Sequence, residues 1–145
     1  MSKTFILVAE GSRAKLYAAV SSTAALTELE DFILPEGRMH EGDLVSDKPG
    51  SDGGAVGQGR HVNDNRTSAT EVAHAAFAKT LVERLERGRN ASEFDQLVMM
   101  APPAFLGLLR SELSPGLTRM VAEEIDKNLV LLSPAEVRMH TSVLR

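Results

Sequence analysis

The residues best suited to chemistry stand in one short run, Gly59-Arg60-His61. An arginine can hold a phosphate or a carboxylate through two parallel hydrogen bonds, and a histidine can exchange a proton near neutral pH. The pair therefore suits anion binding or acid–base chemistry. The structural alternative is that Arg60 pairs with an acidic neighbour, such as Asp47 or Asp64, and that His61 only packs. On the sequence alone both hypotheses stay open.

A second group of charged residues lies where strands are expected to end. Glu10 follows an apolar run, and Asp126-Lys127 follows a segment that can form a strand. If the sheet brings these ends together, we expect Asp126 near Glu10 or Arg13. Two carboxylates could then hold a magnesium ion, but nuclease chemistry of this kind normally needs three or more acids. We therefore expect ion pairs here and no metal site.

The composition excludes several other kinds of site. There is no cysteine, which excludes disulfides, thiolate metal sites and cysteine nucleophiles. A formal charge of −4 and an aromatic content of 4% argue against a strongly basic nucleic-acid binder and a base-stacking platform. The four histidines show no metal-binding spacing, and the phosphate-loop, dinucleotide and serine-elbow motifs are missing. We expect no cofactor.

The length and the first residues indicate how the chain is organised. A length of 145 residues suits one domain, residues 1–145. The apolar run at 5–9 ends at Glu10, so it is too short for a signal peptide or a membrane span. The sequence therefore predicts a cytoplasmic protein without membrane contact.

The elements that must position these residues follow from the hydrophobic pattern. Apolar or alternating runs predict β-strands at 5–9, 14–20, 25–34 and 94–100. Caps and prolines mark four helix starts: Ser68 with Glu71, Pro102-Pro103, Ser114-Pro115, and Ser133-Pro134 with Glu136. The first of these helices is expected to end at Gly88. Residues 117–130 fit both a helical and a strand period.

Residues 36–66 show neither period. Together with Pro35 they form the one long segment without a repeating apolar pattern, and they hold seven glycines. Long irregular segments of compact domains are usually functional or disordered. Six acidic and four basic residues give this segment no strong charge. We predict a Gly-rich loop that carries Arg60 and His61.

Several separated motifs give the chain a specific resemblance. They are Ala9-Glu10-Gly11-Ser12-Arg13-Ala14, Pro35-Glu36-Gly37, Asp43-Leu44-Val45-Ser46-Asp47-Lys48-Pro49-Gly50, Gly59-Arg60-His61, Glu93-Phe94-Asp95, Ala101-Pro102-Pro103-Ala104-Phe105-Leu106-Gly107, Glu124-Ile125-Asp126-Lys127 and Leu132-Ser133-Pro134. In this order and over nearly the whole chain, they resemble the bacterial host attachment protein family. That family is in turn similar to the central domain of archaeal and eukaryotic peptide-release factors, which has an RNase H-like shape.

The resemblance implies an α/β fold, with a mixed sheet of about five strands flanked by helices. It also implies that residues 117–130 form a short helix running into a strand at 121–126. In release factors a Gly-Gly-Gln tripeptide on a flexible loop places an amide beside the ester of peptidyl-tRNA. Here only one glycine directly precedes Gln58, so the tripeptide is not intact. Fold likeness carries function only weakly.

These considerations predict a non-enzymatic binding module with an indirect role in bacterial attachment, which contacts tRNA or the ribosome through the Gly-rich loop. The alternative is a small hydrolase, of the peptidyl-tRNA or phosphoester type, that uses Arg60 and His61. The Leu- and Ala-rich helices could also form a homodimer face. The candidate ligand-binding residues are Arg13, Asp47, Gln58, Arg60, His61, Asp126 and Lys127.

Overall fold

A five-stranded mixed sheet forms the centre of the molecule. The computed structural model describes residues 3–21, 23–34 and 55–144, with side chains from residue 69 onward in the last range. The strands are β1 (Thr4–Glu10), β2 (Arg13–Ala19), β3 (Thr27–Ile33), β4 (Gln96–Met100) and β5 (Val121–Ile125). They lie in the order β3-β2-β1-β4-β5. The pairs β1–β2 and β2–β3 are antiparallel, whereas β1–β4 and β4–β5 are parallel. The predicted mixed sheet is confirmed.

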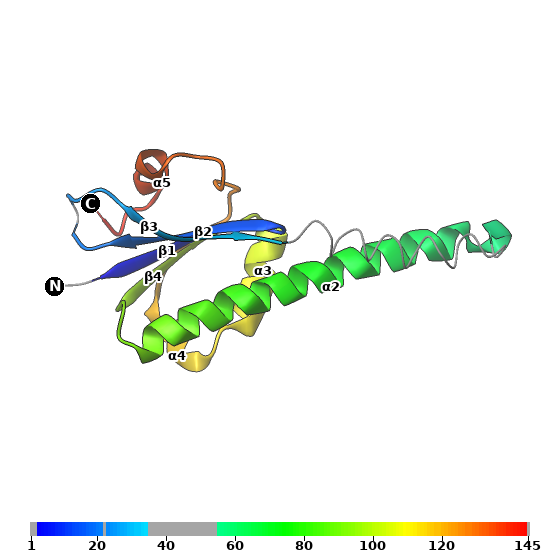
Figure 1. Cartoon of the computed structure of the whole chain (residues 1–145), viewed down its shortest axis with the longest axis horizontal. Helices are drawn as coiled ribbons and strands as arrows, with labels where there is room; N and C mark the ends of the chain where they lie inside the picture. Colours follow the sequence, from blue (N-terminus) through cyan, green and yellow to red (C-terminus); the bar gives the residue numbers. More distant parts are fainter. Residues whose placement is uncertain (1–2, 22, 35–54, 145) are drawn as a thin grey trace.

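Helices cover both faces of this sheet (Figure 1). One face carries α2 (Ala55–Asn90), α3 (Pro103–Glu112) and α4 (Pro115–Met120), and the other carries α5 (Pro134–His140). Alternate residues of β1 enter the two cores. Phe5, Leu7 and Ala9 pack on the α2 side, while Ile6 and Val8 pack on the α5 side. Coverage on both faces explains why the first strand is a continuous apolar run.

Local capping chemistry places the shorter helices as predicted. The Ser114 hydroxyl accepts a hydrogen bond from the Leu117 N–H at 3.1 Å, and α4 follows directly. Ser133 and Glu136 form the reciprocal capping box that begins α5. The ambiguous segment is resolved because α4 ends at Met120 and β5 begins at the next residue. This confirms a short helix running into a strand.

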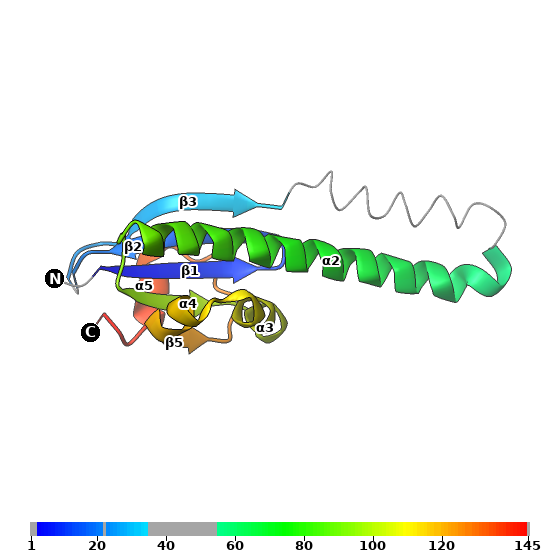
Figure 2. The same ribbon diagram turned by 90° about the horizontal axis from the view of Figure 1, so that it is seen from below.

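The predicted loop at 36–66 is wrong in its second part. Residues 55–66 belong to α2, which runs without interruption from Ala55 to Asn90, past the expected end at Gly88. Ser68 and Glu71 therefore lie inside this helix. The prediction that they form a capping box at its start is wrong. Figures 1 and 2 show the first turns of α2 extending beyond the sheet, and residues 55–66 contain no apolar stripe. The hydrophobic pattern therefore could not reveal them. The remaining loop residues lie outside the described residues.

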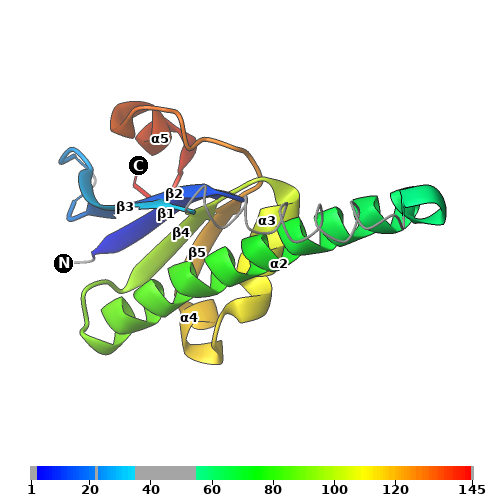
Figure 3. The ribbon, with the colours of Figure 1, turned by 45° about the vertical axis from the view of Figure 1, so that its right-hand side comes forward.

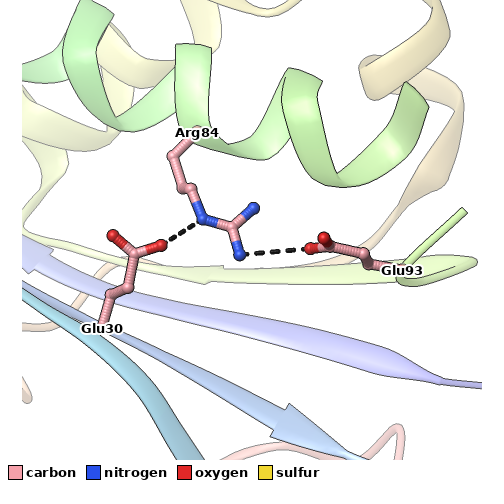
Figure 4. Close-up of polar contacts among 3 residues, drawn as sticks. All are labelled: Glu30, Arg84 and Glu93. Atoms are coloured by element: carbon pink, nitrogen blue, oxygen red, sulfur yellow. Dashed lines mark hydrogen bonds and ion pairs between the residues drawn. The ribbon is translucent and has the colours of Figure 1, made fainter. Parts of the chain in front are cut away.

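The last turns of α2 are fastened to the sheet by Arg84 (Figure 4). Its guanidinium donates through Nε to Glu30 on β3, and through Nη2 to the Glu93 carboxylate at 3.1 Å. The same group lies over the Phe5 ring, 5.8 Å from the ring centroid. Only 14% of the Arg84 side chain is exposed. One cation thus joins the helix, the edge strand and the turn that leads to β4.

We expect Arg84→Ala to lower the free energy of unfolding by about 1–2 kcal/mol, since it removes charged hydrogen bonds and packing over Phe5. Urea unfolding would measure the loss. Arg87→Ala, at an exposed position of the same helix, serves as the matched control and should leave stability nearly unchanged. Equal losses in the two variants would show that the Arg84 contacts do not stabilise the fold.

Candidate functional site

Three of the predicted residues lie on the first turns of α2. Gln58, Arg60 and His61 occupy helical backbone, not the loop expected from the sequence. Successive positions of an α-helix are turned by about 100° around its axis. Positions 60 and 61 are therefore turned by about 100° from each other, and the joint Arg–His catalytic pair stays a prediction. Asp47 lies outside the described residues.

The other predicted residues do not converge. Arg13 pairs with Asp31 across β2 and β3, with 4.0 Å between Nη2 and Oδ2. Asp126 and Lys127 follow β5 and are exposed. Strands β1 and β4 lie between β2 and β5, which separates their backbones by about 14 Å at the usual strand spacing. The prediction that Asp126 lies near Arg13 is therefore wrong.

The possible magnesium site is not assembled either. Strand β4 separates the ends of β1 and β5. The Glu10 carboxylate instead accepts hydrogen bonds from the Ser12 N–H at 3.0 Å and the Ser12 hydroxyl at 2.6 Å. Across residues 3–21, 23–34 and 69–144, no group of three acidic, histidine or cysteine side chains is close enough to hold a metal ion. Glu10 thus orders the β1–β2 turn.

A cleft that the sequence did not predict lies at the carboxyl ends of β1 and β4. Its volume is about 420 Å³. Gly11, directly after β1, forms one wall, and the beginning of α3 after β4 forms another. Helix α2 closes the third side, and Figure 3 shows α2 and α3 side by side there. The lining residues are Gly11, Glu71, His74, Pro102, Ala104, Phe105 and Leu108.

His74 is seated in this cleft by close contacts. A Cβ atom on residue 11 would lie 2.6 Å from His74 Nε2, so only glycine lets the imidazole approach the β1–β2 turn this closely. On its other side, the His74 ring meets Phe105 edge to face, with 6.4 Å between centroids. His74 is half-buried, while Glu71 stands exposed one helical turn before it.

Most of the described lining of the cleft is apolar, and the ionisable side chains in it are Glu71 and His74. The sequence pattern assigned Glu71 to a helix cap and indicated no functional role for His74. A usable signal was nevertheless present, because Gly11 and Pro102-Pro103 each follow a buried strand of the parallel pair. Turns after adjacent parallel strands are a common place for ligands.

Comparison with known proteins gives three results. A family model described as "Protein required for attachment to host cells" matches residues 5–141. An uncharacterized protein of Rickettsia prowazekii (strain Madrid E) is 35% identical over 66 residues, which is 44% of each chain. The crystal structure of an archaeal translation termination factor, aRF1, superposes on 98% of this chain with a TM-score of 0.53 and 14% identity. The chain corresponds to 35% of that factor, and the likeness shows the fold.

One further observation concerns membranes. Within the part of the chain that the structure describes, no helix combines the length and the apolar character needed to cross a bilayer. This includes α2, the longest helix described.

Proposed function

Since this chain belongs to the family of proteins required for attachment to host cells, we propose that it is a non-enzymatic binding module that affects attachment indirectly from the bacterial cytoplasm. Its partner is tRNA or the ribosome, and the contact is made by the first turns of α2. Such a role agrees with the fold, which is like that of a translation termination factor.

The observation that carries this proposal is the projection of α2 beyond the sheet (Figures 1 and 3). Residues 55–68 include Gly57 and Gly59, and glycine costs a helix interior about 1 kcal/mol relative to alanine. Helices gain most of their stability from packing. We infer from this composition and from the projection beyond the sheet that a partner binds this helical segment.

The charge of this segment favours a phosphate-bearing partner. Residues 55–68 contain Arg60 and Arg66 against one acid, Asp64. The local excess is positive although the whole chain carries −4. A few basic residues can supply a weak contact to RNA phosphates that depends strongly on salt.

Co-sedimentation with bacterial ribosomes tests the proposal. We expect association at low salt that weakens steeply as salt rises, because phosphate contacts release counterions. The double variant Arg60→Ala/Arg66→Ala should reduce the association about tenfold or more at low salt. The control Arg87→Ala/Arg119→Ala removes the same charge from exposed positions elsewhere and should bind like the unchanged protein.

If the protein does not associate with ribosomes at low salt, the ribosome proposal is wrong. If both double variants lose the same amount of association, the first turns of α2 do not make the contact. Incubation with peptidyl-tRNA addresses the hydrolase alternative. We expect the ester to survive. Turnover that disappears in Arg60→Ala/His61→Ala would establish the hydrolase instead.

A further inference from the structure

The cleft beside His74 stands where the chain leaves two adjacent parallel strands in opposite directions. After β1 the chain turns to β2 on one side, and after β4 it passes through α3 and α4 to β5 on the other. In open α/β sheets, such a divergence leaves a crevice at the carboxyl ends of the strands, and ligands bind there. Gly11 and Pro102 mark the two departure points in this molecule.

The size and the walls of the cleft suit a small organic molecule. A volume of about 420 Å³ lies within the usual range of ligand pockets. Phe105 and Leu108 provide apolar surface from α3, and the His74 ring stands perpendicular to that of Phe105. Such walls favour a ligand with a compact aliphatic or aromatic body.

The polar lining favours a positive charge on that ligand. Glu71 supplies a carboxylate at the rim, and the described lining contains neither lysine nor arginine. Pro102 and Pro103 remove two of the four N–H groups that the start of a helix offers to an anion, so α3 has fewer donors here than an ordinary helix start.

We propose that this cleft binds a small organic cation, with an ammonium group at Glu71 and an apolar body against Phe105 and Leu108. This site is separate from the first turns of α2, so it does not rest on the ribosome contact.

Titration with three probes of similar shape tests the proposal on the full chain. They are the cation phenethylammonium, the neutral 2-phenylethanol and the anion 3-phenylpropionate. We expect the cation to bind most tightly and to shift the NMR signals of the His74 ring. Glu71→Gln should weaken cation binding about threefold to fivefold, as for an exposed ion pair, and leave 2-phenylethanol unchanged. Glu83→Gln, exposed on the same helix outside the lining, should behave like the unchanged protein.

A second variant tests the cleft itself. Gly11→Ala should displace the His74 ring, since the added Cβ would lie 2.6 Å from Nε2, and should weaken both the cation and the neutral probe while the protein stays folded. Three outcomes would overturn the proposal: tighter binding of the anion, equal binding of all three probes, or binding that leaves the His74 signals unmoved.

Discussion

Replacing Gly88 with valine is expected to lower the free energy of unfolding by about 2–3 kcal/mol, the cost of overfilling a well-packed site. Gly88 lies near the end of α2, where the helix backbone rests on two stacked rings. A Cβ atom there would lie 3.0 Å from Cε1 of Phe94 and 3.1 Å from Cε2 of Phe5. The rings are 4.4 Å apart between centroids and are almost fully buried, so neither can withdraw.

Gly107→Val provides the control for this prediction. Gly107 lies in the middle of α3, and a Cβ atom there would meet nothing within 4 Å. The change of residue type is identical, so the difference between the variants in urea unfolding reports the contacts around Gly88, which are the two rings and the Arg84 guanidinium at 3.2 Å. A loss of stability equal in the two variants would show that the Phe5–Phe94 stack yields to the added side chain.

The second large loss of stability is expected when Glu123 on β5 is replaced, because its carboxylate binds the C-terminal segment. Its Oε1 accepts hydrogen bonds from the Thr141 hydroxyl at 2.6 Å and the Ser142 N–H at 3.0 Å. Thr141 is completely buried, and Leu144 completes the core beneath α5. Glu123→Ala would leave the Thr141 hydroxyl without this acceptor and loosen the segment. We expect a loss of about 2 kcal/mol, within the range for a buried polar group left unsatisfied.

The same contacts predict a dependence on pH. Burial raises the pKa of Glu123, but the hydrogen bonds from Thr141, Ser142 and Val143 outweigh it, so the net pKa lies below its ordinary value. The folded state therefore favours the ionised form. Its contribution is complete above the unfolded pKa of about 4.3 and is lost as the pH falls through the lower folded pKa. The stability difference between the unchanged protein and Glu123→Gln should shrink on acidification.

Urea unfolding at several pH values would measure both effects of Glu123. Glu124→Gln is the control, because its carboxylate pairs with Arg110 at an exposed position, where ion pairs contribute little. If the stability difference between the unchanged protein and Glu123→Gln stays constant down to low pH, the ionised carboxylate of Glu123 does not stabilise the folded state.

Strands β1 and β4 and the starts of α4 and α5 were predictable because their signals are local. Strands β1 and β4 are continuous apolar runs, since both of their faces are covered. The starts of α4 and α5 depend on Ser114 and Ser133, which bond to backbone groups only three residues away. The mixed sheet of five strands followed from the family resemblance, and the order β3-β2-β1-β4-β5 confirms it.

The candidate site was less predictable, because its parts are distant in sequence. Gly11, His74 and Phe105 meet only when β1, α2 and α3 are packed together. The position of Gly11 after a buried strand is a signal for a binding site, but nothing in the pattern around His74 or Phe105 indicates a cleft. Likewise, the pairing of Arg13 with Asp31 depends on the register between β2 and β3, which places Lys15 opposite Asp31 and Arg13 opposite Ile33.

By itself, then, the sequence determined the segments of β1 to β4, the starts of α3, α4 and α5, and the family. Each of these depends on contacts within a few residues or on motifs in a fixed order. Only the tertiary structure decided that α2 continues past the core from Ala55 and that a cleft opens beside His74. The first turns of α2 are polar and contain glycine, so they have no apolar period that would predict a helix. A cleft between three elements exists only once these elements have packed together.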